Sequence, residues 1–168
     1  PKNGGLSDNN SSIYNYLDAK CNIEKNINNI FCYWEWYNFD KSTYLMLKTT
    51  LLSICNYNPN KNIYLFSNTI KDVNFIQLIQ TKNINIVRYK YKDIIEGTPV
   101  EKYHEKYKNI YNNPRPFCDL FRLLVIWKYG GSYTDLDNLC IQKFPDKKNI
   151  LCRCYDWHYG VKDIDCIE

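Results

Sequence analysis

Two aspartates one residue apart, Asp135 and Asp137, have the spacing in this chain that most directly indicates chemistry. They follow residues 132–134, whose types favour an extended backbone. Because side chains alternate along an extended chain, both carboxylates are expected on one side, with Leu136 on the other. Adjacent carboxylates repel each other, and a hard cation such as Mg²⁺ or Mn²⁺ relieves that repulsion by taking oxygen ligands. Such a cation can also bind a diphosphate and neutralise charge on a phosphate leaving group.

A second charged pair, Asp119 and Arg122, lies just upstream on an expected helix. Its apolar residues recur at helical spacing, which predicts one buried face; they are Phe117, Leu120, Phe121, Leu124, Val125 and Trp127. Asp119 and Arg122 are three residues apart and therefore point the same way. Gly130 or Gly131 ends the helix, because glycine readily takes the left-handed conformation. Helix, glycine pair and extended segment thus form one unit that carries both charged pairs.

This unit resembles the DXD signature of nucleotide-sugar glycosyltransferases, in its form S-D-x-x-R followed by Y-G-G-x-Y-x-D-x-D. Here the string reads CDLFR at residues 118–122 and YGGSYTDLD at residues 129–137. The form is typical of glycosyltransferase family 32, shared by α-1,4-galactosyltransferase-like and α-1,6-mannosyltransferase-like enzymes and, more distantly, by the clostridial glucosylating toxins. Cys118 replaces the usual Ser, and Ser132 replaces Ile or Val. Neither departure removes a carboxylate, the arginine or a glycine.

The resemblance implies roles for the charged residues and for Tyr133. Asp137 would ligate the metal directly, and Asp135 would contact the ribose or the metal through water. Asp119 would accept hydrogen bonds from sugar hydroxyls, while Arg122 would bridge sugar and diphosphate. Tyr133 would line the site. The family retains anomeric configuration, so the expected transition state resembles an oxocarbenium ion, with the metal-bound diphosphate as leaving group.

The opening strand is expected at residues 30–36, an apolar and aromatic run. In the family an aromatic residue near the end of this strand lies close to the nucleotide base. Trp34 or Trp36 would then stack on the uracil or guanine ring, with Trp34 favoured. Burial of both tryptophans in the core is an equally good interpretation.

The remaining pattern predicts an α/β fold of the GT-A type, a Rossmann-like sheet flanked by helices. Helices are expected over residues 43–56, 73–81 and 99–110, and strands over residues 62–67, 84–91, 140–145 and 149–155. Ser42 or Thr43 is the expected N-cap of the first of these helices. The charged residues 88–92 indicate an edge strand rather than an RNA-binding patch. The Thr98-Pro99 segment resembles one found at this place in the galactosyltransferase-like branch.

The domain organisation follows from composition and from the extent of the resemblance. Residues 1–28 are polar and are expected to form a stem or linker, with a short helix near Tyr14, Leu17 and Ile23. Residues 29–168 are expected to form the GT-A-like domain. Because family members continue with helices that hold the acceptor, and because the chain begins at Pro1, we expect a fragment that lacks the acceptor-binding part.

Composition places the 168-residue chain among globular proteins, with 45% hydrophobic and 24% charged residues. A net charge of +4 is too small to indicate nucleic acid, and no nucleic-acid partner is expected. The expected partners are a nucleotide sugar and a glycan, glycolipid or glycoprotein acceptor. No apolar run reaches the ~18 residues of a membrane span. Sequons at Asn9 and Asn10 and the resemblance favour the Golgi lumen or membrane, reached through an anchor absent from this chain, with the cytoplasm as the alternative.

Eight cysteines are many for this length, and they are scattered. Cys32, Cys55 and Cys118 lie in apolar contexts typical of buried thiols. In an oxidising compartment, one or two disulfides are compatible with the others. The grouping of Cys152, Cys154, His158 and Cys166 matches known zinc spacings poorly.

The sequence therefore favours a metal-dependent retaining hexosyltransferase that uses UDP-galactose or UDP-N-acetylglucosamine, with GDP-mannose as the alternative. A catalytically inactive nucleotide-sugar-binding protein is the second hypothesis. Taken singly, each pair has a simpler interpretation, because the aspartates can cap a turn with Asn138, and Asp119 and Arg122 can form an exposed ion pair. A phosphoryl-transfer enzyme would need a Walker loop or an H-R-D motif, and a serine hydrolase a G-x-S-x-G motif; the sequence has none of these.

Overall fold

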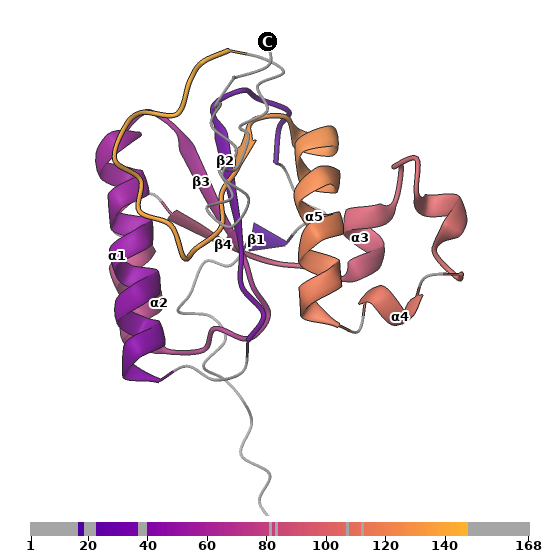
Figure 1. Ribbon diagram of the computed structural model, residues 1–168, viewed down its shortest axis with the longest axis horizontal. Helices are drawn as coiled ribbons and strands as arrows, with labels where there is room; N and C mark the ends of the chain where they lie inside the picture. The colour runs from indigo at the N-terminus through magenta and orange to yellow at the C-terminus, as the bar shows by residue number, and fades with distance from the viewer. Residues whose placement is uncertain are drawn as a thin grey trace, which may run out of the picture.

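The computed structural model describes residues 17–18, 23–36, 40–80, 82, 84–106, 108–111 and 113–147. This part of the chain forms a parallel five-stranded sheet with helices on both faces (Figure 1), which confirms the predicted α/β class. The strands are β1 (Leu17–Asp18), β2 (Asn29–Tyr33), β3 (Asn62–Phe66), β4 (Ile84–Arg88) and β5 (Ser132–Tyr133). The helices are α1 (Lys41–Tyr57), α2 (Val73–Gln80), α3 (Tyr91–Ile95), the 3₁₀ turn η1 (Glu101–Tyr103), α4 (Lys108–Tyr111) and α5 (Pro114–Tyr129).

The sheet has the strand order β1-β4-β3-β2-β5, and all its pairings are parallel. From β2 the chain steps outward to β3 and β4, then returns through α3 to α5 and places β5 on the other side of β2. The order therefore reverses between β2 and β5. In open α/β sheets, ligands bind at the carboxyl ends of the strands that flank such a reversal.

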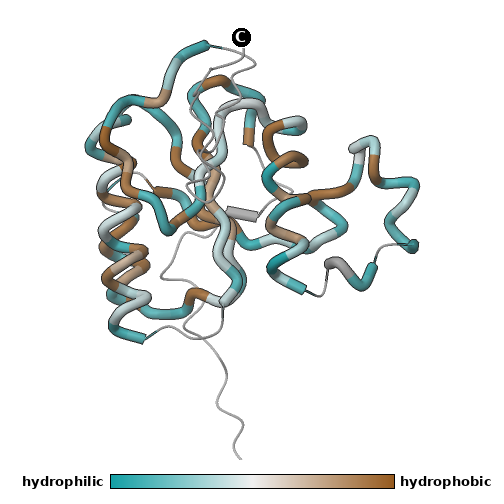
Figure 2. Tube along the Cα trace, viewed as in Figure 1, coloured by the Kyte–Doolittle hydropathy of each residue, from teal (hydrophilic) through white to brown (hydrophobic). Residues whose placement is uncertain are grey.

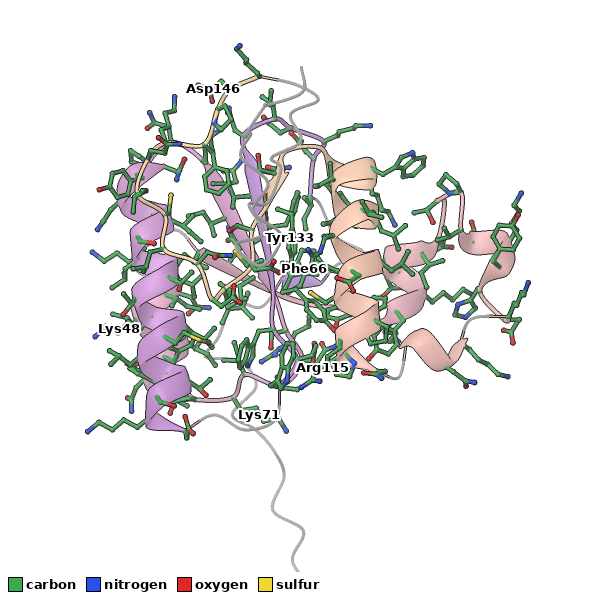
Figure 3. All side chains as sticks on the ribbon, viewed as in Figure 1. Lys48, Phe66, Lys71, Arg115, Tyr133 and Asp146 are labelled. Atoms are coloured by element: carbon green, nitrogen blue, oxygen red, sulfur yellow. The ribbon has the colours of Figure 1, made fainter. Side chains whose placement is uncertain are left out.

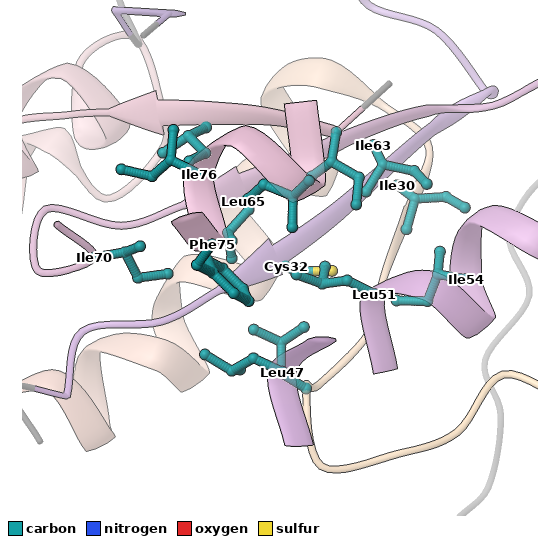
Figure 4. Packing of buried hydrophobic residues seen from close by; sticks show 14 residues of the cluster. Ile30, Cys32, Leu47, Leu51, Ile54, Ile63, Leu65, Ile70, Phe75 and Ile76 are labelled. Carbon is teal, nitrogen blue, oxygen red and sulfur yellow. The ribbon is translucent and has the colours of Figure 1, made fainter. Parts of the chain in front are cut away.

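The two faces of the sheet pack against different kinds of side chain. On the α1 and α2 side the cluster is mostly aliphatic (Figure 4), with Leu47, Leu51 and Ile54 of α1 packed over β2 and β3. On the α5 side the cluster is largely aromatic, and Phe121 contacts the rings of Tyr33 and Phe66. Figure 2 shows the hydrophobic residues concentrated in the strands and on helices such as α1 and α5. Two cores on opposite faces make the sheet a rigid platform for its loops.

Helix α1 begins two residues earlier than expected. Asp40 is its N-cap, and the Oδ1 atom of Asp40 accepts hydrogen bonds from the Thr43 amide at 2.8 Å and the Ser42 hydroxyl at 2.9 Å. The prediction of Ser42 or Thr43 as the cap is therefore wrong. Asp40 stands just before the first helical residue and accepts a hydrogen bond from the free amide of Thr43, so Ser42 and Thr43 already lie inside the first turn.

Helix α5 and the glycine pair occur as predicted, with one exception. Asn113 caps the helix, and Gly130 and Gly131 both have positive φ, of 67° and 81°. A Cβ atom on Gly131 would lie 2.2 Å from the Asn29 carbonyl oxygen, so β5 approaches β2 this closely only with glycine there. Trp127 is 50% exposed, which contradicts its placement on the buried face. It lies roughly 200° around the helix from Val125, which is buried.

The segment between β4 and α5 differs most from expectation. The single helix predicted over residues 99–110 is replaced by a turn, η1 and the short α4. Thr98 does not start a helix but lies in the turn after α3, where its amide and its buried hydroxyl both donate to the Ile95 carbonyl, the hydroxyl at 2.6 Å. Strand β4 stops at Arg88, and the following residues form α3, which was not predicted.

Two further expectations about strands are corrected. Strand β4 is paired on both sides, with β3 and with the short β1, so it is not the charged edge strand that was predicted. Leu17 lies in β1, which contradicts a helix there, and Ile23 is buried in the aromatic core. The boundary of the predicted stem at residue 28 stays a prediction. Within the described ranges, no helix is long and apolar enough to cross a membrane.

Residues 140–145 do not form the predicted strand. Instead they run beside α1 (Figure 1), and side chains of α1 and its C-cap replace strand partners for their backbone amides. The strand predicted at 149–155 and the cysteines at 152, 154 and 166 lie outside the described residues. Within them, Cys32 is fully buried as expected, whereas Cys55 and Cys118 are only half-buried.

Candidate active site

The predicted site residues gather at the carboxyl edge of the sheet, at the reversal of strand order. Trp34 directly follows β2, and Asp135 lies two residues after β5. The Thr134 amide donates to the Phe31 carbonyl at 3.0 Å, which continues the pairing of β5 with β2 up to the first aspartate. Asp119 and Arg122 approach this edge from the middle of α5.

Arg122 joins the helical pair to the aspartate pair. Its Nη2 atom lies 3.0 Å from Asp119 Oδ1 and 3.5 Å from Asp135 Oδ1. The side chain of Asp119 is 77% exposed, that of Arg122 36% and that of Asp135 39%, so all three are accessible to a ligand. The fold thus brings together three of the four charged residues that the sequence singled out.

Tyr133 holds Asp135 from the sheet side. Its hydroxyl donates to Asp135 Oδ1 at 3.1 Å, and the Arg122 guanidinium lies 5.2 Å from the centre of its ring. Burial, followed by the contact with Cys118 and the charge of Asp135, raises the pKa of Tyr133 well above its ordinary value. The phenol therefore stays protonated at neutral pH and acts as a donor. Figure 3 shows Tyr133 between the two helical layers.

The surroundings of Arg122 favour the positively charged form of its guanidinium. Partial burial alone would lower its pKa, but the Asp135 carboxylate, with the Cys118 and Tyr133 contacts, outweighs burial and raises the pKa overall. Its Nε atom is buried and has no hydrogen-bond partner within the described part of the chain. A buried donor without a partner is costly. An anionic or hydroxyl-bearing ligand at this edge would relieve that cost.

The aspartate pair itself is asymmetric. Leu136 is 4% exposed and packs into the aliphatic core, as the expected alternation requires. Asp135 is half-buried and held by Arg122 and Tyr133, whereas Asp137 is exposed in a turn. The alternation of buried and accessible side chains therefore continues through Leu136, although the chain turns at residues 136–137.

Trp34 is only partly buried, beside the aliphatic core. Its ring centre lies 5.1 Å from that of Trp36, which is 39% exposed. The Nε1 atom of Trp34 is buried and finds no acceptor in the described ranges. The pair thus forms an aromatic surface at the edge of the core, and neither tryptophan is wholly part of it.

The donor set fits a metal bound together with its substrate. Across the described ranges, no three His, Cys, Asp or Glu side chains group closely enough to hold an ion by themselves. Mg²⁺ commonly binds through one or two carboxylates and completes its shell with substrate phosphates and water. Asp135 and Asp137 are the residues that would hold such an ion.

Two residues at this edge were not predicted to take part. Cys118 was expected to be a buried thiol, but its Sγ atom lies 3.2 Å from the Tyr133 hydroxyl. The sequence signal for such a role was that Cys118 replaces the usual Ser of the family string. Glu35 is buried, and its Oε1 atom accepts a hydrogen bond from the Asn68 amide at 2.6 Å. Burial raises the pKa of Glu35, although the Asn68 bond, Tyr89 and Arg88 oppose the shift. Nothing local in the sequence marks Glu35.

A parallel sheet that places a DXD pair and an arginine at its strand-order reversal is consistent with a GT-A-like fold. Residues 46–154, more than half of the chain, match the family described as glycosyltransferase sugar-binding region containing DXD motif. The chain belongs to this family.

A solved structure supports the fold. The chain is similar to "PaToxG Glycosyltransferase", with a TM-score of 0.51 and 22% sequence identity, over 72% of this chain and 46% of that chain. The chain thus spans less than half the length of that structure. No curated protein matches the sequence.

Proposed function

We propose that the protein is a retaining hexosyltransferase that uses a nucleotide sugar and Mn²⁺ or Mg²⁺, with a glycan, glycolipid or glycoprotein as acceptor. UDP-galactose or UDP-N-acetylglucosamine is the favoured donor, and GDP-mannose is the alternative. The observation that carries this proposal is Arg122, which pairs with both Asp119 and Asp135 at the strand-order reversal. A cation between two accessible carboxylates suits a ligand that combines an anionic diphosphate with a hydroxyl-rich sugar.

Each residue has a distinct task in this proposal. Arg122 turns from its aspartate partners toward the diphosphate, and its Nε atom supplies a further donor. Asp119, the most exposed of the three, accepts hydrogen bonds from sugar hydroxyls. Tyr133 occupies Oδ1 of Asp135, which leaves Oδ2 for the metal or the ribose. When bound, the divalent ion neutralises the charge that develops on the diphosphate leaving group.

The base-binding part of the proposal rests on Trp34. A partly buried indole beside the carboxyl end of β2 offers a flat apolar surface, and stacking on it contributes about 1–3 kcal/mol per base. The full DXD string and the Thr98-Pro99 segment support a family 32 type of enzyme. With that type we propose the Golgi lumen or membrane as the location, and the cytoplasm as the alternative.

The test is titration of UDP and GDP into the protein with and without Mn²⁺, repeated with Asp137→Ala. We expect one of the two nucleotides to bind only when Mn²⁺ is present, and the one that binds identifies the base of the donor. We expect Asp137→Ala to abolish this binding. Glu105→Ala is the matched control, because it removes one exposed carboxylate from the segment between η1 and α4, outside the DXD unit. A folded wild-type protein that binds neither nucleotide would contradict the proposal.

Turnover separates the enzyme from an inactive binding protein. Incubation of the protein and Mn²⁺ with nucleotide sugars that carry the base identified by titration is expected to release free UDP or GDP, by transfer or by slow hydrolysis. Tight, Mn²⁺-dependent binding without any release would instead favour the inactive nucleotide-sugar-binding protein.

A further inference from the structure

The peptide between the two aspartates is held by helix α1. The Thr50 hydroxyl donates to the Leu136 carbonyl at 2.9 Å, across 86 residues of sequence. Both residues are buried, with Thr50 only 2% and Leu136 only 4% exposed. Because the peptide unit is planar, a fixed Leu136 carbonyl also fixes the direction in which the chain enters Asp137.

The segment that follows is held along the same helix. The Cys140 amide donates to Ser53 Oγ at 3.0 Å, and the Phe144 amide donates to Oδ1 of Asn58, the α1 C-cap, at 2.8 Å. Further on, Asp146 pairs with the buried Lys61 at 2.9 Å. Anchors thus recur at residues 136, 140, 144 and 146, so that α1 and the turn after it act as a template for the chain leaving the site.

The two aspartates need this template to different degrees. The Asp135 side chain is held directly, by Arg122 and Tyr133. Asp137 is exposed in a turn, and within the described part of the chain its carboxylate shows neither of the polar contacts that hold Asp135, a hydrogen bond or an ion pair. Its position therefore depends on its backbone, and Thr50 holds the nearest fixed point of that backbone.

We propose that Thr50 is a positioning residue for metal binding: its hydroxyl orients the Leu136–Asp137 peptide so that the Asp137 carboxylate faces the metal and diphosphate. This inference rests on the proposed function. Thr50 itself does not reach the ligand, since its hydroxyl is buried and directed at the Leu136 carbonyl.

Thr50→Val tests the hydroxyl at almost constant volume. The measurement is the ratio of nucleotide affinities with and without Mn²⁺. We expect Thr50→Val to lower this ratio about tenfold, as for one lost buried hydrogen bond, while affinity without Mn²⁺ stays unchanged. Thr50→Ser restores the hydroxyl and is expected to restore the ratio. Loss of a residue that only stabilised the fold would change the nucleotide affinities with and without Mn²⁺ alike and would leave their ratio unchanged.

Thr49→Val is the matched control, one residue away on the same helix. Its side chain is exposed, and its hydroxyl donates to Leu45 within α1, so no change in the ratio is expected. Ser53→Ala removes the next anchor and is expected to lower the ratio about threefold, which keeps the proposal testable if Thr50→Val does not fold.

The outcomes separate the two proposals. Absence of Mn²⁺-dependent binding in the wild type would overturn the proposed function. Mn²⁺-dependent binding in the wild type with an unchanged ratio in every folded Thr50 and Ser53 variant would overturn the positioning role alone.

Discussion

The DXD segment is held from the two faces of the sheet by different means. On the α5 side, Arg122 and Tyr133 hold the side chain of Asp135 through charge and a hydroxyl, at a half-exposed surface. On the α1 side, Thr50 holds the backbone at Leu136 in a buried, uncharged environment. Groups that must meet a ligand are thus accessible and held by charge, while the geometry behind them is set in the core.

This difference has an energetic side. Ion pairs between exposed groups contribute about 0–1 kcal/mol to stability, so the α5 contacts add little to the free energy of unfolding. Each fully buried Leu or Ile of the α1 cluster contributes about 1.5–3 kcal/mol. Changes to the half-exposed charged residues on the α5 side should therefore alter function more than stability, and changes to the buried apolar residues of either core should alter the fold first.

The largest loss of stability is expected from a substitution at the contact between β5 and β2. Gly131→Ala places a Cβ atom 2.2 Å from the Asn29 carbonyl oxygen in a residue with φ of 81°. We expect a loss of roughly 2–5 kcal/mol in the free energy of unfolding, from the clash and the left-handed backbone together. Chemical denaturation followed by circular dichroism measures it.

Gly97→Ala is its control, because Gly97 has a similar φ of 76° but open space around the added atom. It should cost only roughly 1–2 kcal/mol. Equal losses for the two variants would mean that β5 does not approach β2 closely.

Arg122→Met is expected to separate function from stability. It keeps much of the side-chain volume but removes the cation between Asp119 and Asp135, so nucleotide affinity with Mn²⁺ should fall roughly 100-fold. Stability should change by no more than about 1 kcal/mol. Calorimetric titration measures the nucleotide affinity, and chemical denaturation measures the free energy of unfolding. Arg115→Met, an exposed site at the start of the same helix (Figure 3), should change neither, and a matching loss there would contradict a specific role for Arg122.

Tyr133→Phe, also on the α5 side, is expected to lower nucleotide affinity less than Arg122→Met does. The ring under Arg122 remains, but the bond to Asp135 Oδ1 is lost, so Mn²⁺-dependent affinity should fall about three- to tenfold. Tyr57→Phe, at an exposed tyrosine at the end of α1, is the control for removal of a phenol hydroxyl. Unchanged affinity in Tyr133→Phe would mean that Arg122 alone orients Asp135.

Glu35→Gln is expected to change only the pH dependence of stability. Because burial raises the pKa of Glu35 in the folded protein, the folded state binds more protons than the unfolded state between the two pKa values. The free energy of unfolding of the wild type therefore falls as pH rises through that interval. The variant lacks this titration and should gain stability relative to the wild type between about pH 4 and about pH 7.

Denaturation at both pH values measures this difference. The amide of Gln can still accept the Asn68 hydrogen bond, so the fold should persist. Glu105→Gln, at an exposed carboxylate, should show no such trend. A wild type that gains on the Gln variant as pH rises would contradict the expected sign.

Much of the site could be predicted from the sequence because its parts are neighbours along the chain. Asp119, Arg122, Tyr133 and the aspartates lie within one unit of helix, glycine turn and strand, and each part has a strong local signal. The strands and helices of the first half follow from apolar periodicity for the same reason. The functional roles of these residues stay predictions until ligand binding is measured.

The errors have a common physical origin. Thr98 and Pro99 look like the start of a helix, but a buried hydrogen bond to the Ile95 carbonyl ties Thr98 into the turn that follows α3. Trp127 fits an apolar stripe, but which side of α5 meets the sheet depends on packing with Phe121 and Val125. Residues 140–145 have strand propensity, but their amides are satisfied by Ser53 and Asn58.

The sequence by itself thus determined the α/β class, the glycine turn and the charged residues of the site, because helical spacing, alternation and glycine conformations are local properties. Only the tertiary structure decided that Arg122 lies between Asp119 and Asp135, that Glu35 is buried beside Asn68, and that Thr50 reaches the Leu136 carbonyl. Those contacts join residues up to 86 positions apart, and they exist because a parallel sheet brings the ends of distant segments to one edge.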